Sequence, residues 1–260
     1  MAEKLKIAIL QADLVWENSE ANRNQFRPKI EQLSSDVDLI ILPEMFSTGF
    51  SMNAENLAEP VDGPTLNWMK KNSAENDVAI TGSVIIKEEG KYYNRLFFVT
   101  PDGNIQKYDK RHTFTLAGEN EVYASGQERL IVNYKGWKIC PLVCYDLRFP
   151  VWARNTEDYD ILIFVANWPA VRVVAWDTLL KARAIENLSY CIGVNRVGKD
   201  GNGHPYPGHS AVYDCLGKII SDDSNWEREF QQEIILDKST LEENRKKLKF
   251  LQDRDKFSLK

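Results

Sequence analysis

The sequence predicts an α/β fold with a mixed sheet, and three kinds of observation support that class. Nearly uninterrupted apolar runs, such as Val37–Leu42 and Ile161–Ala166, are typical of strands that are buried on both faces. Helical segments alternate with these runs, which indicates parallel pairing. The runs Val78–Lys87 and Tyr92–Thr100 flank the turn sequence Glu88–Lys91, so a hairpin with antiparallel pairing is predicted as well.

Turn and start signals place the elements of the N-terminal half. Gly63 and Pro64 precede a predicted helix, because proline is favoured in a first helical turn. Pro101-Asp-Gly103 turns the chain out of the hairpin, and the stretch after Leu42 through Pro60 is predicted as a loop. The predicted elements are a strand at Lys6–Ala12, a helix at Glu20–Ser34, a strand at Val37–Leu42, a helix at Thr65–Asn76, the hairpin and a strand at Ile105–Tyr108.

The C-terminal half continues the alternation of strands and helices. Ala175–Leu188 has the clearest helical pattern, a shorter helix is predicted near Val151–Asn155, and Ser239 begins the last predicted helix. The predicted strands of this half are Ile161–Ala166, Tyr190–Val197, Ser210–Tyr213, Lys218–Ser221 and Phe230–Leu236.

Polar residues follow the buried strands at their carboxyl ends. Four apolar strands are followed by Glu44, Cys144, Asn167 and Asn195, and a further strand leads into Lys110. In open α/β sheets, ligands bind at this end of the strands. Glu44, Lys110 and Cys144 have the identities that a cysteine amidohydrolase needs, which are a base, a cation and a nucleophile.

Five motifs, in this order and spacing, resemble the nitrilase superfamily. They are LPEMF around Glu44, YDKRH around Lys110, VCYDLRFP around Cys144, ANWP at 166–169 and KARAIEN at 181–187. The segments MFSTGF, KRHTFTLAGEN and CYDLRFPVWARN are most similar to the omega-amidase branch. The resemblance extends from the first strand to the C-terminal FLQDRDKF.

The resemblance implies a four-layer α-β-β-α sandwich, in which two mixed sheets lie face to face with helices outside. It also implies a homodimer or larger homo-oligomer, with residues 226–260 as an extension that contacts the partner. A small-molecule amide and water are the implied substrates. The family has a second glutamate beside the lysine, for which Glu119 and Glu121 both qualify, and the AGEN context favours Glu119.

Amide hydrolysis needs a nucleophile, a stabilised oxyanion and a proton for the leaving nitrogen. Cys144 is the candidate nucleophile, and Glu44 is expected to take its proton and return it to the departing ammonia. Lys110 and the backbone N–H of Tyr145 are expected to bind the oxyanion. Water activated by Glu44 then releases the acid from a thioester. Taken singly, these residues also fit a helix cap, a surface charge and a core thiol; their occurrence together favours catalysis.

An omega-amidase acts on short 2-oxo acid amides such as 2-oxoglutaramate, whose far end carries a carboxylate. Arg148 and Arg172 lie just beyond rim strands, and a guanidinium binds a carboxylate through two parallel hydrogen bonds. The alternative for each is a surface arginine. Trp168, Phe114 and Phe46 are expected to wall a small apolar cavity, with core packing as the alternative for each.

Other interpretations remain open from the sequence. The same catalytic residues would serve an N-carbamoyl amino acid hydrolase, an aliphatic amidase or a nitrile hydrolase, depending on the loops at 47–60 and 113–123. A third interpretation is a non-catalytic binding subunit, which the intact set of base, cation and nucleophile disfavours. Glu186 is expected to be structural, as an ion-pair partner of Arg183.

No metal or nucleotide cofactor is predicted. The histidines His112, His204 and His209 lack the spacing of metal-binding motifs such as HExxH. Neither a GxSxG serine motif nor a glycine-rich phosphate loop is present. His204 and His209 lie in a turn-rich loop. They are expected either to order that loop or to contact the cavity.

Composition sets the remaining limits. Of 260 residues, 43% are apolar and 27% are charged, as in ordinary soluble globular proteins, and a net charge of −5 gives no electrostatic case for nucleic acid. No apolar stretch approaches the ~20 residues of a membrane span. The first strand is entered by Leu5, which leaves no room for a signal peptide, so a cytoplasmic location is expected. Without an internal linker, we expect a single domain over residues 1–260.

Overall fold

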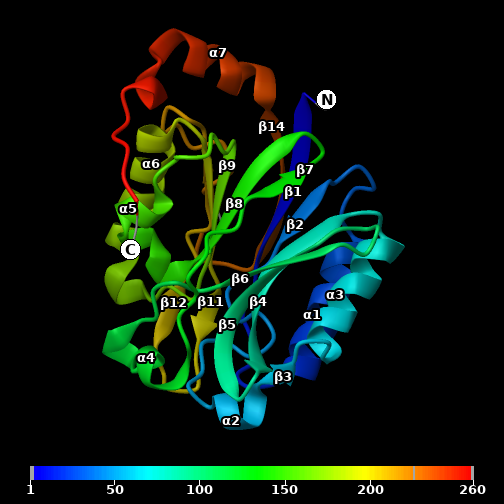
Figure 1. Ribbon diagram of the computed structural model, residues 1–260. Coiled ribbons are helices and arrows are strands. Elements are labelled where there is room, and N and C mark those ends of the chain that lie inside the picture. Colours follow the sequence, from blue (N-terminus) through cyan, green and yellow to red (C-terminus); the bar gives the residue numbers. More distant parts are fainter. Residues whose placement is uncertain (1–2, 225, 259–260) are drawn as a thin grey trace.

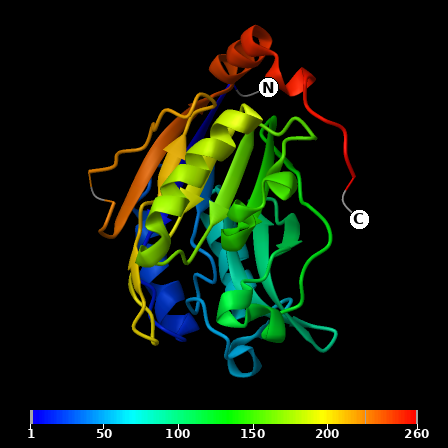
Figure 2. The same cartoon turned by 90° about the vertical axis from the view of Figure 1, so that its left-hand side faces the viewer.

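Two β-sheets lie face to face between outer layers of helices in the computed structural model, which describes residues 3–224 and 226–258 (Figures 1 and 2). Each sheet contains parallel and antiparallel pairs of strands. The four-layer α-β-β-α sandwich is therefore confirmed.

The first sheet combines strands from the N-terminal half with one C-terminal strand. Its strands are β1 (Lys4–Gln11), β2 (Leu39–Ile41), β3 (Glu59–Pro60), β4 (Ala79–Glu88), β5 (Lys91–Val99), β6 (Ile105–Asp109) and β14 (Phe230–Asp237). The order is β14-β1-β2-β4-β5-β6, and β3 pairs with β4. β1, β2 and β4 run parallel, whereas β14, β5 and β6 are antiparallel to their neighbours.

The second sheet is formed by the middle of the chain and has the order β13-β10-β9-β8-β7. Its strands are β7 (Val132–Tyr134), β8 (Trp137–Val143), β9 (Ile161–Val165), β10 (Tyr190–Val194) and β13 (Ala211–Tyr213). β8, β9 and β10 are parallel. A separate ribbon pairs β11 (Val197–Lys199) with β12 (Pro205–Pro207).

Helices cover the outer faces of both sheets. In Figure 1, α1 and α3 lie on the first sheet, while α5 and α6 lie on the second. The α-helices are α1 (Ser19–Glu31), α2 (Ala54–Leu57), α3 (Pro64–Glu75), α4 (Glu119–Val122), α5 (Pro150–Ala153), α6 (Val173–Asn187) and α7 (Lys238–Leu248). Among the described helices, none combines the length and apolar character needed to cross a membrane.

The alternation of side chains along β1 explains why its sequence is apolar at nearly every position. Leu5, Ile7 and Ile9 belong to the core between the two sheets, whereas Ala8 and Leu10 pack in the core beneath the outer helices. Successive side chains of a strand point to opposite faces. A strand placed between two layers must therefore be apolar on both faces, which is the pattern that predicted the buried strands.

Short elements differ from the sequence predictions. The predicted strand at Lys218–Ser221 is reduced to a single bridge between Tyr213 and Ile219. The predicted loop before Pro60 contains α2 and β3. β10 ends at Val194 instead of continuing to 197, because the next residue, Asn195, uses its side chain to bind two loops at the rim of the sheet.

Candidate active site

The carboxyl ends of the central strands bring four predicted polar residues to one rim. Glu44 follows β2, Lys110 follows β6, Cys144 follows β8, and Asn167 follows β9. Hydrogen bonds connect each of them to at least one of the others. The two sheets thus contribute to one site, because Glu44 and Lys110 follow strands of the first sheet and Cys144 follows a strand of the second.

Lys110 lies between two carboxylates in a fully buried cluster. Its Nζ donates to Glu44 Oε1 at 2.8 Å and to Glu119 Oε2 at 2.8 Å. The Asn94 amide donates to both carboxylates, at 2.8 Å and 3.2 Å. Lys110 is 1% exposed, and both glutamates are 0% exposed. Glu119 is therefore the second carboxylate at the lysine, whereas Glu121 is exposed.

Burial and charge act against each other in this cluster. Burial alone would lower the pKa of Lys110, but the charges of Glu119 and Glu44 outweigh it and raise that pKa, so the lysine stays an ammonium. Burial raises the pKa of Glu119, although Lys110 opposes the shift. One ammonium thus faces two carboxylates. This excess of negative charge disfavours a thiolate at Cys144.

Cys144 occupies a strained position at the start of a 3-10 turn, η2 (Cys144–Arg148). Its φ of 43° is in the left-handed region, which side chains with a Cβ rarely adopt, and such strain is concentrated at functional sites. Its Sγ lies 3.9 Å from the backbone oxygen of Asn167. Burial first and the nearby Glu44 second raise the pKa of the thiol well above its usual value. The thiol is therefore protonated at neutral pH.

Asn167 positions Glu44 from two sides. Its backbone N–H donates to Glu44 Oε2 at 2.8 Å, and its side-chain amide donates to the backbone oxygen of Glu44. Glu44 is thereby held by three donors, because Lys110 and Asn94 bind its other oxygen. The sequence marked Asn167 only as a polar residue at a strand end and gave it no role.

The carboxylate of Asp146 links the turn at Cys144 to the segment that follows β6 and contains Lys110. Asp146, which is fully buried, accepts the backbone N–H of Val143 at 3.0 Å and the Tyr108 hydroxyl at 2.7 Å. It also accepts the backbone N–H of His112 at 3.0 Å and contacts the ring Nδ1 at 2.7 Å. His112 therefore lies behind the site, and its ring stacks on Phe149.

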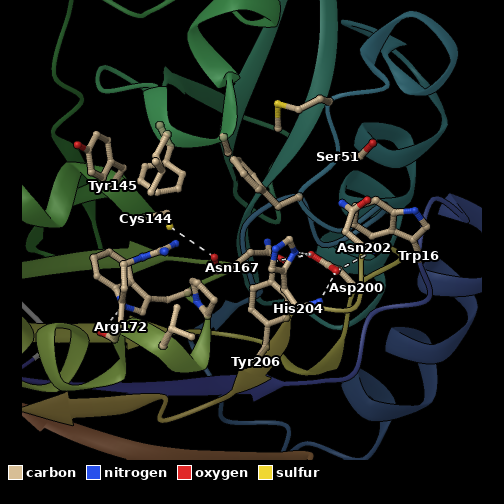
Figure 3. A pocket seen from close by; sticks show the side chains of 18 of the residues that line it. Trp16, Ser51, Cys144, Tyr145, Asn167, Arg172, Asp200, Asn202, His204 and Tyr206 are labelled. Atoms are coloured by element: carbon tan, nitrogen blue, oxygen red, sulfur yellow. Dashed lines mark hydrogen bonds and ion pairs between the residues drawn. The ribbon is translucent and has the colours of Figure 1, made fainter.

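A cavity of about 580 Å³ opens over Cys144 and Lys110 (Figure 3). Its lining includes Tyr145 and two of the three predicted aromatic wall residues, Phe114 and Trp168. These side chains contribute apolar surface around the thiol, and electrostatic interactions are stronger in apolar surroundings than in water.

The third aromatic prediction is wrong. Phe46 does not line the cavity but is fully buried in the core under α1 and α3. Its ring centroid lies 5.8 Å from that of Phe26 and 5.8 Å from that of Trp68. The turn after β2 directs Glu44 to the rim and Phe46 to the opposite, helix-covered face of the sheet, so the core-packing alternative holds for it.

Both predicted arginines line the cavity. The guanidinium carbon of Arg172 lies 4.9 Å from the ring centre of Phe114, and that of Arg148 lies 5.0 Å from the ring centre of Trp168. Burial lowers the pKa of Arg172, and the charge of Arg148 also acts in that direction. Within residues 3–224 and 226–258, neither side chain has a carboxylate partner. Two unpaired guanidinium groups beside the thiol favour an anionic ligand.

The opposite side of the cavity contains residues that no sequence motif indicated. Glu17 has a φ of 52°, and its carboxylate accepts hydrogen bonds from Ser51 Oγ at 2.5 Å and Asn53 Nδ2 at 3.3 Å. Asp200 lies nearby in the loop before β12. These residues come from three loops that are far apart in the sequence, so only the fold brings them together.

The two histidines of the turn-rich loop order it, as predicted. The His204 ring contacts Asp200 Oδ2 at 3.1 Å and lines the cavity, and the His209 ring contacts Asp177 at 3.1 Å. No group of three or more potential metal-binding side chains occurs in the described part of the chain. The predicted ion pair between Arg183 and Glu186 also forms, with 2.9 Å between Nη1 and Oε1.

Comparisons with known proteins agree with this architecture. A model of the carbon-nitrogen hydrolase family matches residues 6–242. The chain is 46% identical over 256 residues to the omega-amidase YafV of Yersinia enterocolitica, covering 98% of each chain. It is 32% identical over 241 residues to the 2-oxoglutaramate amidase of Bacillus subtilis, covering 91% of this chain and 93% of that one.

A solved structure of a related protein has the same fold. XC1258 from Xanthomonas campestris, described as a CN-hydrolase superfamily protein with an arsenic adduct in its active site, is 44% identical to this chain. The two structures agree with a TM-score of 0.97 over 100% of both chains. These similarities confirm the resemblance that the five motifs indicate. The chain belongs to the carbon-nitrogen hydrolase family and is a hydrolase of non-peptide carbon–nitrogen bonds.

Proposed function

We propose that this enzyme releases ammonia from a short omega-amide of a 2-oxo dicarboxylic acid such as 2-oxoglutaramate, through a thioester on Cys144. The main support for the proposal is that two features occur in the same cavity. A buried cluster of Glu44, Lys110 and Glu119 lies against the thiol. Two guanidinium groups that have no carboxylate partner among the described residues line the same cavity. The first feature supports amide cleavage and the second supports binding of a carboxylate.

Glu44 is the general base and then the general acid in this mechanism. The raised pKa of Cys144 means that a free thiolate is scarce at neutral pH, so Glu44 takes the proton as sulfur attacks the amide carbon. Glu44 then returns that proton to the nitrogen, and ammonia leaves. The acyl group remains on Cys144 as a thioester.

Lys110 binds the oxyanion, together with the backbone N–H of Tyr145. Its ammonium is kept charged by Glu119 and Glu44 and is 1% exposed, so it is a fixed and buried donor. Loss of one such donor typically raises the barrier by about 3–4 kcal/mol. Water, deprotonated by Glu44, then attacks the thioester, and Cys144 recovers its proton as the acid departs.

Arg148 and Arg172 bind the far carboxylate of the substrate. Both guanidinium groups lie over aromatic rings that wall the cavity, which holds them in place without neutralising them. The two relatives named as an omega-amidase and as a 2-oxoglutaramate amidase support this substrate class.

The decisive experiment measures ammonia release by the purified enzyme and its Cys144→Ala variant. The substrates are 2-oxoglutaramate, glutamine, asparagine, an N-carbamoyl amino acid, a simple aliphatic amide and a nitrile. Turnover confined to the 2-oxo amide and abolished in the variant is expected. A preference for another substrate would keep the mechanism and discard the omega-amidase assignment. Absence of turnover on all of them, with Cys144 inert to alkylation, would indicate a binding subunit.

We also propose that residues 1–260 act as one domain that assembles as a homodimer, with residues 226–260 contacting the partner. Two features support this proposal. β14 is an edge strand of the first sheet, and Ile235 on it is 57% exposed. Light scattering coupled to size-exclusion chromatography tests it, because a mass of one chain, 29.9 kDa, would contradict the dimer.

A further inference from the structure

The cavity is larger and more varied than a five-carbon amide requires. Its volume of about 580 Å³ is within the range of ~300–1,000 Å³ that proteins use for drug-sized ligands. The two arginines account for one side only. On the other side lies a set of residues that we name the outer compartment, consisting of Trp16, Glu17, Asn53, Asp200, Asn202 and His204.

The two sides of the cavity differ in charge and flank the nucleophile. Figure 3 shows Arg172 on one side of Cys144, and Asp200, His204 and Trp16 on the other, with Asn167 between them. One side presents guanidinium groups and the other presents carboxylates. A ligand that spans both sides is therefore complemented when it is anionic at one end and cationic at the other.

The proposed chemistry decides which part of a substrate faces the outer compartment. Glu44 must protonate the leaving nitrogen, and its carboxylate is held by the backbone N–H of Asn167 at 2.8 Å. Asn167 lies on the side of Cys144 toward the outer compartment (Figure 3). With the acyl chain directed to the arginines, a substituent on the amide nitrogen points away from them and toward Asp200 and Glu17.

Hydrogen bonds hold the side chains of the outer compartment in place. Asp200 accepts the backbone N–H groups of Asn202 and His204 at 2.9 Å each and the Tyr206 hydroxyl at 3.0 Å. Burial alone would raise the pKa of Asp200, but these hydrogen bonds outweigh it and lower that pKa, so the group stays anionic. The buried cation behind this wall, Arg196, is paired with Asp13 at 2.8 Å.

Glu17 supplies the second carboxylate, and its backbone is strained. A φ of 52° at a residue with a long side chain is unfavourable, and such conformations are retained where they hold a functional group in place. Hydrogen bonds from Ser51 and Asn53 fix the carboxylate at the cavity wall. Trp16 lines the same compartment, and an indole ring is the aromatic group that binds ammonium groups best.

We propose that the enzyme hydrolyses secondary omega-amides whose leaving amine carries an ammonium group, with that ammonium bound in the outer compartment. The proposal rests on the proposed function, because it uses the same thiol, base and acyl site. Cys144 sulfur adds to the amide carbon, the C–N bond breaks, and Glu44 delivers the thiol proton to nitrogen. A primary amine leaves, and water then converts the thioester into the carboxylic acid and the free thiol.

The test compares three synthetic derivatives of 2-oxoglutaramate, each substituted on the amide nitrogen, as substrates of the wild-type enzyme. The amide nitrogen carries a 4-aminobutyl group, a butyl group or a 3-carboxypropyl group, so that length is similar and charge differs. The kcat/KM should be highest for the cationic leaving group and lowest for the anionic one. A cationic-to-neutral ratio of about ten is expected from one charge-assisted contact. Primary 2-oxoglutaramate is measured in parallel.

The Glu17→Gln variant locates the effect, because glutamine keeps the shape of the side chain and removes its charge. This variant should reduce the cationic-to-neutral ratio to near one. The matched control is Glu20→Gln, which removes an exposed carboxylate three residues away on α1 and should leave the ratio at the wild-type value.

The outcomes separate the two proposals. Turnover of primary 2-oxoglutaramate without turnover of any N-substituted amide overturns the outer-compartment proposal and leaves the proposed function intact. Equal kcat/KM for the cationic and neutral amides overturns it as well. If primary 2-oxoglutaramate itself is not hydrolysed while another primary amide is, the acyl assignment fails and the proposed function with it.

Discussion

Asp146 and His112 join the segment that carries Cys144 to the segment that carries Lys110. Asp146 lies two residues after Cys144, and His112 lies two residues after Lys110. The carboxylate accepts the backbone N–H of His112 and contacts its ring nitrogen at 2.7 Å. One buried carboxylate therefore holds the segment of Cys144, from the second sheet, against the segment of Lys110, from the first.

Asp146→Asn should lower both stability and activity. The amide nitrogen of asparagine would face groups that donate hydrogen bonds to the native carboxylate, such as Val143 N–H and the Tyr108 hydroxyl. Leaving buried donors without an acceptor is expected to cost about 3 kcal/mol in the free energy of unfolding. Urea denaturation measures this loss, and kcat is measured well below the transition. Asp253→Asn, at an exposed position, is the control, and equal stability of the two variants would refute the anchoring role.

Glu119→Gln should reduce kcat about a hundredfold or more, because Lys110 loses one of its two carboxylate partners and the Phe114 backbone N–H loses a charged acceptor. Steady-state ammonia release measures the effect. The matched control is Glu121→Gln, since Glu121 lies on the same short helix but is exposed. A near-wild-type rate for the Glu119 variant would remove that residue from the mechanism.

Alkylation of Cys144 should report its raised pKa directly. Below the pKa, the thiolate fraction rises about tenfold per pH unit, so the rate of reaction with iodoacetamide should still be rising at pH 9. An ordinary cysteine, with a pKa near 8.5, would already be levelling off. Cys144→Ala gives the background from the other buried thiols. A plateau that begins below pH 8 would mean a preformed thiolate and would contradict the need for Glu44.

Arg148→Ala and Arg172→Ala should each raise KM for 2-oxoglutaramate, by about tenfold or more, with a smaller effect on kcat. The reason is the loss of a charge-assisted contact to the substrate carboxylate. An uncharged aliphatic amide should be insensitive to both changes, and Arg27→Ala, on the exposed side of α1, serves as the control. Unchanged KM in both arginine variants would show that the carboxylate is recognised elsewhere.

Much of the fold was predictable because its central strands are buried on both faces. β8 from Ile139 onward, β9 and β10 are apolar at successive positions, and each is followed by a polar rim residue, so strand type and strand end are both visible in the sequence. The same logic placed Glu44, Cys144 and Asn167 at one edge. The sequence pattern does not reveal whether a side chain in the turn after a strand points into the cavity or back into the core. The predicted position of Phe46 is wrong for this reason.

The outer compartment could not be predicted, for a related reason. Glu17, Asn53 and Asp200 lie in loops without a periodic pattern, which follow β1, β2 and β11, and only the tertiary fold brings those loops together. The short ribbon of β11 and β12 has the same origin, since its register depends on the turn that Asp200 organises. Residues of this kind are recognised from tertiary structure and not from motifs.

The pairing of β1 with β14 also affects the synthesis of this chain. Lys4 is paired with Asp237, so one edge of β1 has no partner until nearly the whole polypeptide has been made. An open strand edge is a template for pairing with other chains. A nascent or truncated chain that ends before Phe230 therefore exposes this edge, and aggregation competes with folding until β14 closes the sheet.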